Sequence, residues 1–210
     1  TLPAVIIANL NGIHFEVRYL FISLLAIVFN LLMVGLGYGV GRTKDEKAFY
    51  MLNLNGYNIG NFALPFVSYF FDSAAVLIVC LFDAGNSLMC LGGGYGLARY
   101  VRGEKGDNIF YILAKTIFSS LPVLSYMLMI ILALGGLALP QVVIDWVKVP
   151  ASANTFLSML MIGVALGLSL KKEYLHLIYS DIGLRLLISA VFAVFVYVGL
   201  DYSMDRSEEH

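Results

Sequence analysis

The sequence carries little charge. Only 13% of its 210 residues are charged and 60% are hydrophobic, whereas about a quarter of the residues of a soluble domain are usually charged. It also has few cysteines: Cys80 and Cys90 lie in one apolar run without metal-binding companions, so we expect both to behave as small hydrophobic residues. No basic stripe indicates a nucleic acid partner. The scarcity of charge indicates instead a protein whose solvent is the lipid bilayer.

Long apolar runs separated by short polar connectors make up most of the chain. Apart from a short first run, each is close to or above the roughly 18 residues that cross a bilayer, and backbone in lipid must satisfy its own hydrogen bonds. We therefore predict an all-α membrane protein, a helical bundle of about six full transmembrane helices plus a stub, with residues 1–210 in a single transmembrane domain. The runs are Leu2–Ile7, Tyr19–Gly41, Ala48–Phe71, Ala74–Ala98, Ile109–Leu139, Asn154–Leu170 and Ile182–Leu200.

Positive charges predict the orientation of this bundle, because short cytoplasmic connectors hold an excess of Lys and Arg. The cations alternate from one side to the other along the chain. This alternation places residue 1 in the cytoplasm and Asp201–His210 outside. One side holds Arg42, Lys44, Lys47, Arg99, Arg102, Lys105, Lys115, Lys171, Lys172 and Arg185, and the other holds Arg18, Lys148 and Arg206.

The third apolar run is unusually polar for a membrane helix. Pro65 removes an amide and crowds the carbonyl of Asn61, so the helix should kink or open over the preceding turn, helped by Gly60. Freed backbone groups at membrane depth must be buried in protein or line a wet cavity, as in the broken helices of secondary transporters. The polar residues of this run are Asn53, Asn55, Asn58 and Asn61.

Two interpretations of this run remain open. The second half-helix, starting near Pro65, would direct its partly positive N-terminus at the break, where an anionic group is the natural ligand and Asn58 and Asn61 supply amides. The alternative is a proline kink whose asparagines bond between helices.

Asp83 is an acidic residue in the middle of the fourth run. An ionised carboxylate at that depth must be paired or become neutral, which makes Asp83, with Asn86 on the same helix face, a candidate for proton or sodium coupling. Alternatively, Asp83 bonds inertly to the exposed backbone of the broken run, or it lies near the outer water layer. The glycines at Gly92–Gly96 are better explained by close helix packing than by a phosphate loop. No nucleophile or metal constellation indicates an enzyme or a cofactor.

The segment Asn58-Ile-Gly60-Asn-Phe-Ala-Leu-Pro65 resembles the Asn-x-Gly-x-x-Gly-x-Pro signature of the auxin efflux carrier family, with Ala63 where a glycine is expected. The run Phe82-Asp-Ala-Gly-Asn86 and the segment Leu157–Leu168 support the match. The resemblance implies a fold similar to sodium/bile-acid symporters: ten helices in two inverted repeats with broken, crossing helices.

Under this resemblance, residues 1–100 hold helices two to five at the end of the first repeat, and residues 109–200 hold helices six to eight at the start of the second. Asn58 would contact a substrate carboxylate and Pro65 would break the helix. The second crossover helix would follow the last residue, so half of the expected site would be missing. The resemblance also implies a bacterial inner-membrane protein that forms homodimers through its scaffold helices.

The sequence thus leads to two functional hypotheses. The first is a secondary carrier of a small organic anion, such as malonate, malate or an auxin-like acid, which works by alternating access around the broken helix. The second is a non-transporting membrane receptor or interaction subunit that binds an anion or partner helices.

Overall fold

The computed structural model describes residues 1–13, 16–103, 108–166 and 175–208, and these residues form helices without any β-strand. Two compact units are present, Thr1–Leu168 and Ser169–His210. The second unit is described by one long helix, α10 (Leu175–Glu208). The predicted all-α class is confirmed.

The first unit contains the remaining helices. Their order includes two π-helical turns: η2, which leads directly into α4, and η3, which lies between α5 and α6. The elements are α1 (Leu2–Leu10), η1 (Val17–Tyr19), α2 (Leu20–Val40), α3 (Lys44–Leu54), η2 (Ile59–Ala63), α4 (Leu64–Phe70), α5 (Ser73–Leu88), η3 (Met89–Gly93), α6 (Gly94–Arg102), α7 (Ile109–Ser119), α8 (Leu121–Leu134) and α9 (Gln141–Leu166).

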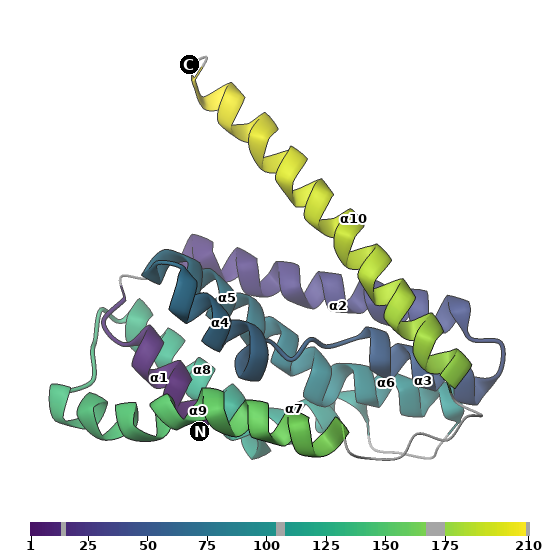
Figure 1. Cartoon of the computed structure of the whole chain (residues 1–210), viewed down its shortest axis with the longest axis horizontal. Coiled ribbons are helices and arrows are strands. Elements are labelled where there is room, and N and C mark those ends of the chain that lie inside the picture. The colour runs from purple at the N-terminus through teal and green to yellow at the C-terminus, as the bar shows by residue number, and fades with distance from the viewer. Residues whose placement is uncertain (14–15, 104–107, 167–174, 209–210) are drawn as a thin grey trace. The chain divides into compact units, whose positions relative to one another are not determined.

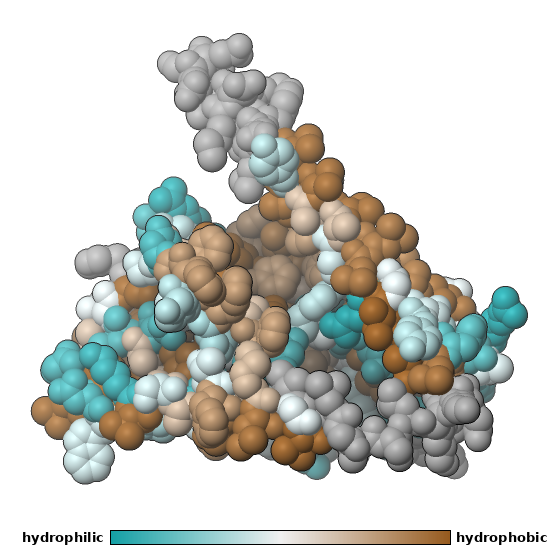
Figure 2. Space-filling view, in the orientation of Figure 1, coloured by the Kyte–Doolittle hydropathy of each residue, from teal (hydrophilic) through white to brown (hydrophobic). Residues whose placement is uncertain are grey.

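Three helical segments in the described residues are long and apolar enough to cross a membrane: Val17–Val40, Ser73–Arg102 and Leu175–Val198. They indicate a multi-pass membrane protein. Apolar side chains cover much of the surface visible in Figure 2. Large apolar side chains of α2, among them Phe21, Leu24 and Leu32, are exposed in the isolated chain. Lipid contacts would suit these side chains better than water.

Local sequence signals explain several helix ends. The Thr43 hydroxyl accepts a hydrogen bond from the Glu46 backbone N–H at 3.1 Å, and the Glu46 carboxylate accepts one from the Arg42 backbone N–H at 2.9 Å. This reciprocal pair caps α3. Asp72 caps α5 by accepting from the Ala75 N–H at 3.0 Å.

Two predicted runs fold differently from the expectation. The run Ile109–Leu139 is one apolar stretch in the sequence and was expected to form one helix. At its far end, α8 stops at Leu134, and Gly136 has a positive φ of 65°. However, Ser120 adopts an extended conformation and caps a new helix whose first turn contains Pro122, so the run divides into α7 and α8.

The predicted span Asn154–Leu170 begins earlier than expected. Helix α9 starts at Gln141 and includes Asp145, Lys148 and Pro150, which had been placed in a connector. Helix α10 likewise continues through the polar residues after Leu200 as far as Glu208. Of the cations that predicted the orientation, Lys105, Lys171 and Lys172 lie outside the described residues.

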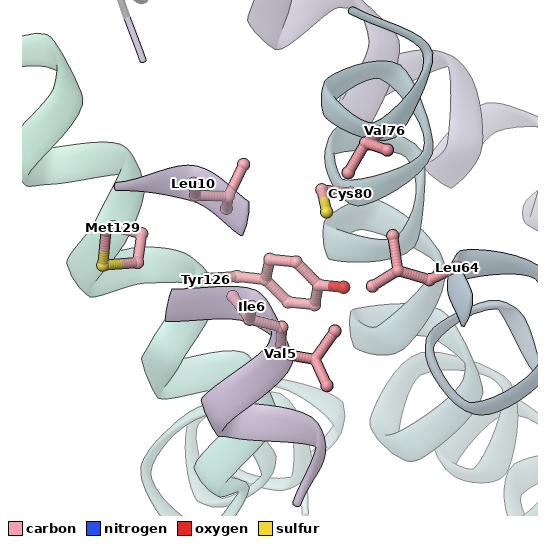
Figure 3. Packing of buried hydrophobic residues seen from close by; sticks show 8 residues of the cluster. All are labelled: Val5, Ile6, Leu10, Leu64, Val76, Cys80, Tyr126 and Met129. Atoms are coloured by element: carbon pink, nitrogen blue, oxygen red, sulfur yellow. The ribbon is translucent and has the colours of Figure 1, made fainter. Parts of the chain in front are cut away.

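Helix packing in the first unit brings distant segments together. Helix α2 packs lengthwise against α5 and α3, while α1 packs against α8 and α9 (Figure 1). A core between α1, α4, α5 and α8 surrounds the ring of Tyr126, whose hydroxyl points away from α8 toward α4 and α5 (Figure 3). The core residues are Val5, Ile6, Leu10, Leu64, Val76, Cys80, Tyr126 and Met129.

The contact between α2 and α3 predicts opposite effects for two glycine substitutions. A Cβ on buried Gly37 would lie 2.6 Å from the Met51 backbone nitrogen, whereas a Cβ on Gly39 would meet nothing within 4 Å. Gly37→Ala should therefore lower the free energy of unfolding by about 1–3 kcal/mol through overpacking. Gly39→Ala should leave it unchanged or raise it by up to about 1 kcal/mol, because alanine favours helix.

Thermal unfolding of the two variants in the same detergent measures this difference. Equal melting temperatures for Gly37→Ala and Gly39→Ala would contradict the close α2–α3 contact.

Candidate functional site

The predicted break in the third apolar run is present, upstream of the proline that was expected to start the second half-helix. Helix α3 ends at Leu54, residues 55–58 are not helical, and helical structure resumes at Ile59. Gly56 lies in this break with a φ of 80°, a conformation that side chains other than glycine rarely adopt. The helix therefore opens at the Asn- and Gly-rich segment itself.

Pro65 lies in the first turn of α4, directly after the π-helical turn η2. In that turn the Leu64 N–H donates to the Ile59 carbonyl, five residues earlier. A proline cannot donate to the preceding turn and its ring crowds the carbonyl there, and the wider π turn accommodates both effects. Pro65 thus shapes the helix after the break and is not among the residues that line the adjacent cavity.

Two buried asparagine side chains hold the open backbone. The Gly56 N–H donates to Asn30 Oδ1 at 2.8 Å, and the Tyr57 N–H donates to Asn86 Oδ1 at 3.0 Å. In return, Asn86 Nδ2 donates to the Tyr57 carbonyl at 2.8 Å. Asn30 and Asn86 are 0% and 2% exposed. We call this pair the amide clamp.

The amide clamp uses its hydrogen-bonding groups almost completely. Asn86 Nδ2 also donates to Asp83 Oδ1 at 3.1 Å, and Asn86 Oδ1 also accepts from Asn30 Nδ2 at 3.4 Å. Asn30 Nδ2 donates in addition to the Ala26 carbonyl at 2.9 Å. A side-chain amide offers two donors and two acceptor positions, so Asn86 is saturated and its orientation is fixed.

Asp83 lies beside the clamp and is 3% exposed. Its Oδ2 accepts a hydrogen bond from the Tyr126 hydroxyl at 2.7 Å, while Oδ1 accepts from Asn86. Gly60 packs closely on the same group, since a Cβ there would lie 2.8 Å from Asp83 Oδ2. In the described part of the chain, Asp83 forms no ion pair. The hydrogen bonds to the open backbone come from Asn30 and Asn86, and Asp83 supports them through its bond with Asn86.

The second helical irregularity faces the first. Asn55 Nδ2 donates to the Met89 carbonyl, in the π-helical turn η3, at 3.2 Å. A Cβ on Gly56 would come within 2.6 Å of Cys90 Sγ, and a Cβ on Gly94 would collide with the Asn55 amide. Within the Gly92–Gly96 cluster, Gly94 therefore serves close packing, as predicted.

A cavity of about 370 Å³ opens beside the break. Its size is within the range of small-molecule sites. The side chains of Asn58 and Asn61 line it and form no hydrogen bond with the described chain, so their amides are available to a ligand. The lining residues are Leu2, Gly56, Tyr57, Asn58, Ile59, Gly60, Asn61, Asp83, Asn86, Ser87, Cys90, Leu91 and Pro122.

Most of the residues singled out from sequence meet in this cavity, namely Asn58, Gly60, Asn61, Asp83 and Asn86. Sequence reasoning missed Asn30 and Tyr126. An isolated asparagine in the otherwise apolar run Tyr19–Gly41 was a usable signal for Asn30. Tyr126 gave no such signal, because a tyrosine in an apolar run is commonplace.

The two cysteines differ from each other in the structure. Cys90 was expected to behave as a small hydrophobic residue, yet it is exposed and lines the cavity, whereas Cys80 is buried.

Comparison of the chain with protein-family models, with curated proteins and with solved structures gave no match.

The amide clamp predicts a local effect of Asn86→Ala. Removing this side chain takes away the hydrogen bonds that it makes with the part-buried Tyr57 N–H and carbonyl, which should lower the free energy of unfolding by roughly 1–3 kcal/mol. We expect a lower melting temperature and faster hydrogen exchange at the Tyr57 amide, measured by mass spectrometry. Asn53→Ala is the control, because Asn53 is exposed and donates to the Phe49 carbonyl of its own helix. Unchanged exchange at Tyr57 in Asn86→Ala would refute the clamp.

Proposed function

We propose that this chain is part of a secondary carrier for a small organic anion, and that the anion binds in the cavity beside the break. The observation that carries the proposal is the pair of unbonded amides, Asn58 and Asn61, on the wall of a cavity next to an opened helix. Opened helices of this kind build the substrate sites of secondary transporters. The resemblance to the auxin efflux carrier family rests on the same residues.

The chemistry of the cavity supports an anionic substrate. The helical segment Ile59–Phe70 begins at the cavity, where Ile59, Gly60 and Asn61 form part of the lining. The first backbone N–H groups of a helical segment lack partners in a preceding turn, and the N-terminus carries a partial positive charge. Together with the amide groups of Asn58 and Asn61, these donors could bind a carboxylate.

An internal similarity supports the inverted repeat that the family resemblance implies. Leu2-Pro-Ala-Val-Ile-Ile7 at the start of α1 and Leu139-Pro-Gln-Val-Val-Ile144 at the start of α9 share Leu, Pro, Val and Ile at matching places. The two helices run antiparallel. At the start of α1, the Thr1 hydroxyl donates to Asn154 Oδ1 at 2.6 Å, midway along α9. After the end of α1, Asn11 Oδ1 accepts from the Leu139 N–H at 2.7 Å, just before α9 begins.

In this proposal, α1 to α6 belong to the first repeat and α7 to α10 to the second, within a ten-helix carrier. The protein lies in a bacterial inner membrane with residue 1 on the cytoplasmic side, and two copies pair through their scaffold helices. Transport follows from movement of the broken-helix part against that scaffold.

A binding screen on the purified chain tests the proposal. Malonate, malate, acetate and indole-3-acetate are added in turn, and selective binding raises the melting temperature, since a ligand at a hundred times its Kd stabilises by about 2.7 kcal/mol. At least one of these anions should do so, whereas matched cations such as choline should not.

Asn58→Ala and Asn61→Ala should each weaken binding of that anion about tenfold or more, because a hydrogen bond to a charged group contributes about 1.5–3 kcal/mol. Asn53→Ala, the same substitution outside the cavity, should bind like the parent. Full affinity in both cavity variants would place the site elsewhere.

A further inference from the structure

The cavity presents an electrostatic conflict with its proposed ligand. Asp83 is part of its lining, and no Lys, Arg or His side chain is among the described lining residues. An ionised Asp83 and a substrate carboxylate would repel each other at short range in a poorly screened site. The anion therefore needs a compensating positive charge that the described walls of the cavity do not provide.

We propose that the cavity takes up its anion together with one proton, which binds to the Asp83 carboxylate and converts it to the neutral acid. This inference rests on the proposed function and specifies how that site is neutralised. The proton comes from water in the cavity and adds to an Asp83 oxygen without breaking any covalent bond. Anion binding and proton binding are then linked, so each favours the other.

The bond between Tyr126 and Asp83 favours a proton over a sodium ion. A tyrosine hydroxyl both donates and accepts. It donates to Oδ2 of the ionised carboxylate at 2.7 Å, and by rotating it can accept from the protonated acid at the same place. Sodium, in contrast, would need several oxygen ligands, yet both Asp83 oxygens already face protein donors, Tyr126 and Asn86. Tyr126 is thus a positioning residue that serves both protonation states.

The other titratable groups near the cavity do not compete with Asp83 as the site that binds the proton. Cys80 lies on α5, the same helix as Asp83, and is buried. Cys90 and Tyr57 line the cavity, but neither side chain is a carboxyl group. Helix α1 has no charged side chain and α9, which packs on η2, exposes its charged residues. On the helices packed against α5, the remaining charged or titratable side chains in the described chain are exposed, namely Tyr38 on α2, Tyr69 on α4, and Tyr111 and Lys115 on α7.

The test measures protons directly. Malonate is added to the purified chain in a nearly unbuffered solution with a pH indicator, over a range in which malonate itself stays fully ionised. We expect uptake of one proton per bound malonate and a Kd that rises up to about tenfold per pH unit. Sodium chloride and choline chloride at equal concentration should give the same result.

Two variants distinguish a loss of the coupling between proton and anion binding from a general loss of structure. Asp83→Asn copies the neutral acid, since its carbonyl can accept from Asn86 and its amide can donate to the Tyr126 oxygen. It should bind malonate at every pH as the parent does at low pH, without proton uptake. Tyr126→Phe keeps the ring in the core but removes a donor to the ionised carboxylate. It should retain proton uptake while its pH profile moves toward higher pH.

The outcomes are distinct. Malonate binding that is independent of pH, without proton uptake, or binding that requires sodium, would overturn the inference and leave the anion site intact. Asp83→Asn that still takes up a proton would overturn it as well. If none of malonate, malate, acetate and indole-3-acetate binds, the proposed function fails first and the inference falls with it.

Discussion

The structure depends on one constraint: backbone groups that leave a helix inside an apolar layer must find partners in the protein. At the break after α3 the amide clamp meets this need, because Asn30 and Asn86 bond the open backbone at Gly56 and Tyr57. Water would otherwise have to reach these groups. The clamp explains why a helix can stay open here without loss of stability.

The same constraint links the fold to the site. Since Asn86 is saturated by the clamp and by Asp83, it fixes the carboxylate beside the break, and Tyr126 ties that carboxylate to α8. Helices α2, α5 and α8 are therefore joined through one polar network. Asn58 and Asn61, which the network does not use, remain to face the cavity. The asparagines that hold the open backbone thus come from α2 and α5, whereas the two that face the cavity lie at the end of the break and in the turn that follows it.

Sequence patterns predicted the helical class, the break and, of about six full spans, three that the described residues show at membrane-crossing length. They could do so because hydrophobic length and Asn, Gly and Pro are local signals. They also singled out five of the residues that line the cavity, but not Pro65, which lies outside it. They placed the restart of the helix too late, since Pro65 was given an effect that the π turn η2 absorbs. Asn30 and Tyr126 could not be assigned to the network, because their partners lie 26 and 43 residues away in the chain. The split at Ser120 reflects a cap that uniform hydropathy conceals.

The central claim is that an anion occupies the cavity beside the break. The most direct test is to measure chemical modification of the two cysteines of the chain with and without the anion. Cys90 is exposed in the cavity lining and Cys80 is buried, so a small thiol reagent should modify Cys90 alone. Mass spectrometry then follows the rate with and without malonate, or whichever carboxylate raises the melting temperature. The account predicts slower modification of Cys90 at saturating anion. An unchanged rate with an anion that does bind would contradict it.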